Sequence, residues 1–194
     1  MGNRQVVVFA GPSGSGKNAV IEALLFRFKR CSLLVNATTR PLREGEKEGV
    51  DYYFLSEEAF KDGLQKGDIL EYRFVPSLGT YYGTYKSDLE ARIRRGDIVL
   101  AHKDIVGARY FKDNYGAVTI FLLPESIESL ERRIRARNPA MSEGELRERM
   151  RMVKAEVEKD SPQYDYRVVN RDGKLDETVQ EIVDILKEEG YNLK

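Results

Sequence analysis

The sequence contains no tryptophan, one cysteine and one histidine among its 194 residues. A single cysteine cannot form an internal disulfide, and one cysteine with one histidine offers no cluster with metal-ligand spacing. We therefore expect a cytoplasmic protein whose stability comes from its core.

The chain also lacks an excess of charge of either sign, because 32 Lys and Arg residues balance 32 Asp and Glu residues. Without a long-range basic field, neither nucleic acid nor an anionic membrane is expected as a partner. The longest apolar run near the start, residues 6–10, is far shorter than the roughly 20 residues that span a bilayer. The length fits one domain.

Apolar runs and helical patterns alternate along most of the chain. Three segments are apolar at almost every position, as are strands that are buried on both faces of a parallel sheet. They are residues 5–10, 97–101 and 117–123. Each lies next to a segment with apolar residues at helical spacing, such as residues 19–28. This order predicts an α/β domain with right-handed crossovers.

Two regions depart from this alternation. Residues 36–86 are rich in aromatic residues and are interrupted by Pro and Gly, which predicts a small mixed or antiparallel sheet projecting from the main one. Residues 137–145 break two charged helices with Asn-Pro and Gly. A mobile lid and a plain helix-helix turn both fit that break.

The segment GPSGSGKN follows the first predicted strand and opens a helix. It satisfies the phosphate-binding pattern G-x-x-x-x-G-K-[ST] except at Asn18, where a hydroxyl normally meets magnesium. Gly11, Gly14 and Gly16 permit a tight turn whose N–H groups converge on phosphate at the positive end of the helix. Lys17 is placed to reach the outer phosphates.

Together with ATTRPLREGEKEGVDYYF, LEY and YYGT further along, this loop resembles the guanylate kinase family over essentially the whole chain. The resemblance implies ATP-dependent phosphorylation of GMP, with Mg²⁺ as the cofactor that accompanies ATP. It implies a P-loop NTPase-like parallel sheet flanked by helices, with a small mixed-sheet GMP-binding lobe and a helical lid. A single domain over 1–194 would then divide into a core (1–35, 87–134 and 153–194), the lobe (36–86) and the lid (135–152).

The resemblance also implies the site residues. Those expected to hold ATP are Gly11, Pro12, Ser13, Gly14, Ser15, Gly16, Lys17, Asn18 and Asn170. Those expected to hold GMP are Asn36, Arg40, Arg43, Tyr52, Glu71, Tyr82, Thr84 and Asp104. Those expected to act on the transferring phosphoryl group are Lys17, Arg40, Arg133, Arg137 and Arg149.

The arginines of the expected acceptor site suit phosphate, because guanidinium groups bind its oxygens bidentately. Pro41 biases Arg40 towards extended backbone, so Arg40 and Arg43 would converge from a loop. The alternative is that they pair with the acidic residues Glu44, Glu46 and Glu48 on a solvated loop. The lid arginines have a similar alternative, since an exposed amphipathic helix has the same composition.

Glu71 is the residue that the resemblance matches to the guanine base. A carboxylate can accept both the N1–H and the amino group of guanine, whereas adenine has an acceptor at N1. Asn36 and Thr84 stand where the family usually has serines, and both can form hydrogen bonds. The alternative for Glu71 is a strand glutamate that faces water.

The second departure from the family pattern is His102-Lys103-Asp104, where an Asp-x-Asp pair is expected. Asp104 remains, but His102 replaces the first acid, and imidazole is a poor partner for the water shell of a hard cation. Strand alternation points Lys103 away from the face that its two neighbours share. The sequence therefore assigns no metal ligands.

Two other functions stay open at this point. One is a related P-loop kinase that acts on another nucleotide or a sugar phosphate. The other is a non-catalytic guanylate kinase-like module, against which Lys17 and the lid arginines speak. The oligomeric state is not predicted.

Overall fold

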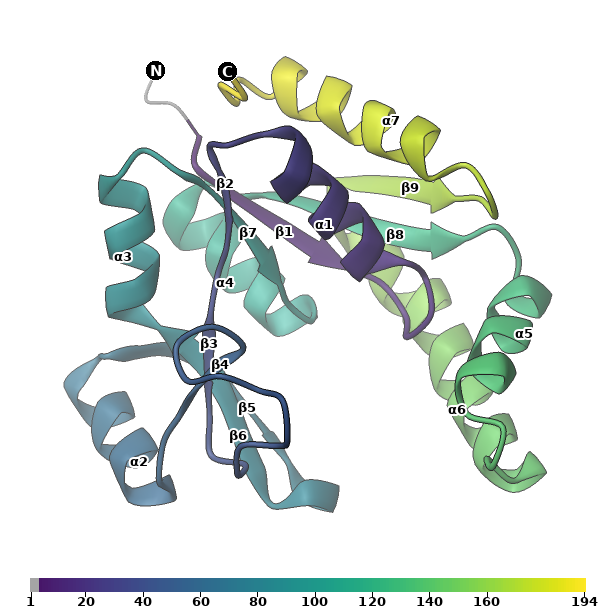
Figure 1. Ribbon diagram of the computed structural model, residues 1–194, viewed down its shortest axis with the longest axis horizontal. Coiled ribbons are helices and arrows are strands. Elements are labelled where there is room, and N and C mark those ends of the chain that lie inside the picture. Colours follow the sequence, from purple (N-terminus) through teal and green to yellow (C-terminus); the bar gives the residue numbers. More distant parts are fainter. Residues whose placement is uncertain (1–3) are drawn as a thin grey trace.

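The computed structural model describes residues 4–194 (Figure 1). Its elements follow in the order β1 (Val6–Ala10), α1 (Lys17–Arg27), β2 (Cys31–Leu33), β3 (Asn36–Thr38), β4 (Tyr52–Phe54), α2 (Glu57–Lys66), β5 (Ile69–Val75), a 3₁₀ turn (Pro76–Leu78), β6 (Thr80–Tyr85), α3 (Lys86–Arg94), β7 (Ile98–His102), α4 (Ile105–Tyr115), β8 (Val118–Pro124), α5 (Ile127–Arg137), α6 (Glu143–Ala155), a π-helical turn (Glu156–Asp160), a 3₁₀ turn (Ser161–Gln163), β9 (Tyr166–Asn170) and α7 (Leu175–Glu188).

The main sheet is parallel throughout, with the strand order β2-β7-β1-β8-β9. Helices α1 and α7 cover one face and α3 and α4 cover the other (Figure 1). Strand β1 therefore buries alternate side chains in two separate cores, which explains why residues 6–10 contain no polar residue. The predicted α/β fold is confirmed.

A second, four-stranded sheet forms a small lobe beside the main one, with the order β4-β3-β6-β5. Strands β3 and β4 are parallel and the other pairs are antiparallel, so the sheet is mixed, as predicted. Its core centres on Phe60 of α2, which packs on Ala37 and Ile69. Gly83 allows this approach, because a Cβ atom there would lie 2.9 Å from the Phe60 ring.

Helices α5 and α6 lie at the opposite side of the main sheet from the small lobe (Figure 1). Ser126 and Ser142 cap their first turns, and each cap forms a reciprocal capping box. The two helices pack on each other through a small apolar cluster of their own, which includes Leu130, Leu146 and Met150. The break at Asn-Pro is thus a turn between two packed helices.

The register of the main sheet brings distant segments of the chain to one edge. Phe9 of β1 pairs with His102 of β7, and Ala10 pairs with Phe121 of β8. Since all three strands run in the same direction, the segments that follow them leave from the same edge. The loop at 11–16, the segment after His102 and the start of the lid helices therefore lie next to each other.

Within residues 4–194, no helix is both long and apolar enough to cross a membrane.

Two phenylalanines offer a matched test of the core of the small lobe. Phe60 is fully buried, whereas Phe26 on α1 is 94% exposed. We expect Phe60→Ala to lower the free energy of unfolding by about 3–5 kcal/mol, because it leaves a cavity. Phe26→Ala should change it by no more than about 0.5 kcal/mol. Urea unfolding of both variants measures the difference, and equal losses would contradict the packing described here.

Candidate active site

The loop between β1 and α1 has a backbone that favours glycine at three positions, Gly11, Gly14 and Gly16, all of which have a positive φ. Gly11 has φ 135° and Gly16 has φ 89°, both in the region that disfavours side chains. A Cβ atom at Gly11 would lie 2.4 Å from the Leu122 carbonyl oxygen, and one at Gly16 would lie 2.1 Å from the Asn170 amide nitrogen. Helix α1 starts at Lys17 without a side-chain cap, so its N-terminal N–H groups remain available to an anion.

Lys17, the first residue of α1, directly follows this loop and is buried. Its ammonium group donates to the Gly11 carbonyl and, at 3.0 Å, to the Pro12 carbonyl. Burial lowers the pKa of Lys17 to about 8, and the charge of Glu156 opposes that shift. The loop thus holds the lysine in position before any phosphate binds.

Three further residues that the sequence predicted for ATP and the transferring phosphoryl group contact the loop directly. The Asn170 amide donates to the Ser15 carbonyl at 2.8 Å, and the Arg133 guanidinium donates to the Gly14 carbonyl at 3.0 Å. Arg149 donates to the Ser13 hydroxyl at 2.9 Å.

Arg137 completes this side of the site. It lines a pocket of about 350 Å³ together with residues of the loop, Lys17 and Asn18. The lid arginines therefore gather at the loop, although they come from two helices that follow it by more than a hundred residues.

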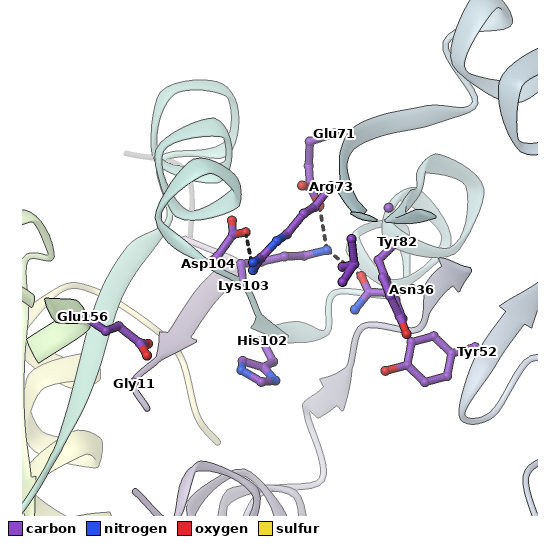
Figure 2. Close-up of a pocket in the computed structure, with 12 residues that line it drawn as sticks. Gly11, Asn36, Tyr52, Glu71, Arg73, Tyr82, His102, Lys103, Asp104 and Glu156 are labelled. Atoms are coloured by element: carbon purple, nitrogen blue, oxygen red, sulfur yellow. Dashed lines mark hydrogen bonds and ion pairs between the residues drawn. The ribbon is translucent and has the colours of Figure 1, made fainter. Parts of the chain in front are cut away.

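A second pocket, of about 360 Å³, opens between the main sheet and the small lobe (Figure 2). Most of the residues predicted for GMP line it, namely Asn36, Tyr52, Glu71, Tyr82 and Asp104. Gly11 and His102 line both this pocket and the one at the loop. The two pockets therefore adjoin each other at these residues.

Arg40 lies beside this second pocket and is buried. Its guanidinium group forms a bidentate pair with Glu46, at 2.7 Å and 2.5 Å, and lies 5.0 Å from the centre of the Tyr52 ring. The Arg40 guanidinium and the Arg43 backbone N–H lower the pKa of Glu46 to about 2. Arg40 is therefore paired with a loop glutamate, as in the alternative interpretation of the sequence. The Arg43 side chain is exposed.

Tyr52 and Tyr82 stand next to Arg40, with their ring centres 6.0 Å apart. Burial raises the pKa of Tyr52, and the neighbouring Tyr82 adds to that shift. Tyr52 is therefore a neutral hydrogen-bond donor at physiological pH.

Lys103 is a site residue that the sequence interpretation missed. Its side chain lies in the second pocket, which His102 and Asp104 also line (Figure 2). Its ammonium group contacts Glu71 at 2.7 Å and Asn36 at 2.5 Å. Burial lowers the pKa of Lys103, and the carboxylate of Glu71 opposes that shift. The feature of the sequence that could have identified Lys103 as a site residue is its position at the end of an apolar strand.

Asp104 and Arg73 form an ion pair at the edge of the same pocket. Asp104 caps α4 by accepting from the N–H groups of Val106 and Gly107, and its second oxygen lies 3.3 Å from Arg73. Glu156 lines the pocket from the π-helical turn. Glu156 lies in a charged helical segment of the sequence, and nothing there distinguishes it from a solvated glutamate.

Known proteins match the chain over nearly its full length. The sequence profile of the family described as "Guanylate kinase" matches residues 3–189. A guanylate kinase of Prochlorococcus marinus is 40% identical over 185 residues, which are 95% of this chain and 97% of that protein. A guanylate kinase of Synechocystis is 37% identical over 186 residues, which are 95% of this chain and 94% of that protein.

The chain belongs to the guanylate kinase family. A crystal structure of guanylate kinase from Anaplasma phagocytophilum superimposes with a TM-score of 0.70 at 31% identity, covering 98% of this chain and 87% of that one. The predicted family, the fold and the class of enzyme, a nucleoside monophosphate kinase, are thereby confirmed.

His102 makes a testable contribution to stability. Loss of solvation in the crowded cleft, with the charges of Lys17 and Lys103, lowers its pKa from 6.5 to about 4, while Asp104 opposes the shift. The folded state therefore favours neutral His102, so this contribution is complete above pH 6.5 and is lost as the pH falls towards 4. We expect His102→Asn to lose less thermal stability than the wild type between about pH 7.5 and about pH 5. Parallel losses in the two proteins would contradict the shift.

Proposed function

We propose that the chain transfers the terminal phosphoryl group of ATP to GMP, giving ADP and GDP, with the two adjoining pockets as the donor and acceptor sites. The observation that carries this proposal is the shared wall formed by Gly11 and His102. Nucleotides bound in the two pockets would meet with their phosphates at that wall. A phosphate oxygen of GMP attacks the terminal phosphorus of ATP, and the bond to the bridging oxygen of ADP breaks. No general base is needed, because the attacking oxygen is already an anion.

On the donor side, the backbone of the loop and Lys17 would hold the phosphates of ATP. Asn18 lies in the same pocket, and Asn170 supports the loop from β9. Arg133, Arg137 and Arg149 would contact the negative charge that develops on the transferring group, and positioned cations of this kind contribute most of the catalysis in phosphoryl transfer. In this arrangement the lid helices α5 and α6 complete the donor site.

On the acceptor side, Arg40, Arg43, Tyr52 and Tyr82 would hold the phosphate of GMP. Because Arg40 is paired with Glu46, the incoming phosphate must share or replace that carboxylate. The more highly charged phosphate is the stronger partner for a guanidinium fork. Glu71, Asn36, Thr84 and Asp104 would contact the base.

The described residues do not build a magnesium site of their own. No cluster of three or more His, Cys, Asp or Glu residues in the described part of the chain could hold a metal ion. Asp104 is committed to α4 and Arg73, whereas the amide oxygen of Asn18 is a hard ligand in the pocket at the loop. The donor set suits a magnesium ion that arrives with ATP.

The proposed division assigns residues 36–86 to the acceptor lobe, 135–152 to the lid and the rest of 1–194 to the core of one domain. We also propose a cytoplasmic location, because the substrates of the proposed reaction are ATP and GMP.

The phosphoryl-transfer role of Lys17 can be tested with a coupled assay of ADP and GDP formation. Lys17→Met removes the ammonium group and keeps most of the stem, so we expect kcat to fall by at least about 10²-fold. Lys29→Met, on the exposed surface after α1, is the control and should retain wild-type turnover. Wild-type turnover in Lys17→Met would contradict the role. A substrate panel without preference for GMP would instead favour a different acceptor.

A second prediction concerns the two departures from the family pattern. Asn18→Ser restores a hydroxyl in the pocket at the loop, and His102→Asp restores an acid at the wall between the pockets. Oxygen ligands suit the hydrated Mg²⁺ ion better than imidazole does. We expect the double variant to reach half-maximal turnover at a lower Mg²⁺ concentration than the wild type, measured by titration at fixed ATP. An unchanged or higher requirement would show that the native residues do not weaken magnesium binding.

A further inference from the structure

The buried ammonium group of Lys103 uses all its hydrogen-bonding capacity inside the acceptor pocket. Its three protons match three acceptors: the Asn36 amide oxygen at 2.5 Å, the Thr84 hydroxyl at 2.5 Å and Glu71 Oε1 at 2.7 Å. The stem of Lys103 passes over Gly107, where a Cβ atom would lie 3.0 Å from the lysine Cβ. The side chain is 7% exposed, so the surrounding packing fixes its position.

These bonds use up one oxygen of Glu71. Oε1 accepts from the Thr84 hydroxyl at 2.6 Å as well as from Lys103, which accounts for both of its lone pairs. Within residues 4–194, Glu71 Oε2 has no hydrogen-bond donor, and Glu71 lines the pocket. A ligand therefore meets one carboxylate oxygen where an unpaired glutamate would offer two.

Lys103 also fixes the orientation of Asn36. An ammonium group only donates, so the amide oxygen of Asn36 must face it and the amide NH₂ group must point elsewhere. Among the described residues the Asn36 NH₂ group has no acceptor, and Asn36 lines the pocket beside Glu71. Around Lys103, the pocket thus presents Glu71 Oε2 as a free acceptor and the Asn36 amide as a free donor.

We infer that Lys103 determines base specificity in this pocket, limiting recognition to the N1–H and C6=O edge of a 6-oxopurine. Glu71 Oε2 accepts N1–H and the Asn36 amide donates to O6. The 2-amino group of guanine finds no acceptor on Glu71, because Lys103 and Thr84 occupy Oε1. The inference rests on the proposed function, since it places the base of the acceptor nucleotide in this pocket.

This geometry admits hypoxanthine as well as guanine. Hypoxanthine has the same N1–H and C6=O edge and lacks only the 2-amino group. Adenine has an acceptor at N1 and a donor at C6, so it places like groups against both Glu71 and Asn36. The pocket should therefore accept IMP beside GMP and reject AMP.

The neighbouring carboxylate does not replace the lost acceptor. Asp104 Oδ1 accepts two backbone N–H groups, and Oδ2 is paired with Arg73. In Figure 2 the Asp104 carboxylate lies at the Arg73 guanidinium. Glu156 also lines the pocket, but Figure 2 shows it on the far side of Lys103 and Asp104 from Glu71. Beside Glu71, the 2-amino group thus meets no free carboxylate oxygen apart from the one that already accepts N1–H.

The test compares kcat/KM for GMP, IMP and AMP at saturating Mg-ATP in the wild type and in Lys103→Met. Methionine keeps the length of the side chain and removes the ammonium group, which frees Glu71 Oε1. We expect the wild-type ratio of GMP to IMP to lie within about tenfold, and Lys103→Met to raise it roughly 10- to 100-fold, the factor for one hydrogen bond to a charged group. Lys86→Met removes one charge from the start of α3 and should leave the ratio unchanged.

The outcomes separate this inference from the proposed function. The inference alone would be overturned if the wild type phosphorylated GMP but used IMP at least about 100-fold less efficiently. It would also be overturned if the ratio of kcat/KM for GMP to that for IMP changed in Asp104→Asn but not in Lys103→Met. Turnover of neither nucleotide would overturn both. Calorimetric dissociation constants of GMP and IMP for the wild-type protein decide the question even if Lys103→Met does not fold: similar values support the inference, and a large preference for GMP contradicts it.

Discussion

The arrangement of the whole site depends on the parallel pairing of β1 with β7 and β8. This pairing sets Phe9 opposite His102 and Ala10 opposite Phe121. The glycine loop, the segment after His102 and the entry to the lid must then leave the sheet at one edge. A shift of register would move the two pockets apart, because the wall that they share consists of Gly11 after β1 and His102 at the end of β7.

A buried ion pair joins the main sheet to the small lobe at that edge. Lys103 follows β7, whereas Glu71, Asn36 and Thr84 belong to the lobe. Removing two charges from water is costly, and such a pair is stable only when its remaining hydrogen-bonding groups are also satisfied. The three contacts of the Lys103 ammonium meet this condition. The same contacts that fix the lobe against the sheet thus also set what the pocket offers to a base.

Several of the cations expected to contact phosphate already have partners in the protein. Lys17 is bonded to loop carbonyls, Arg40 to Glu46, and Arg133 to Asp172 and the Gly14 carbonyl. These partners hold the side chains in place and limit the entropy lost when a phosphate binds. They also make binding selective, since a ligand must carry enough negative charge to compete with a carboxylate or a carbonyl.

Local sequence patterns determined the loop, the buried parallel strands, the mixed lobe and the break between the lid helices. These features follow from glycine conformation, from apolar runs and from Pro and Gly punctuation, all of which act over a few residues. The positions of the lid arginines at the loop were expected from a family resemblance rather than from spacing. Only the tertiary structure decided the partners of Lys103, Arg40 and Glu156. Lys103 meets Glu71 across 32 positions of chain, and such a contact depends on how two sheets pack, which no local pattern encodes.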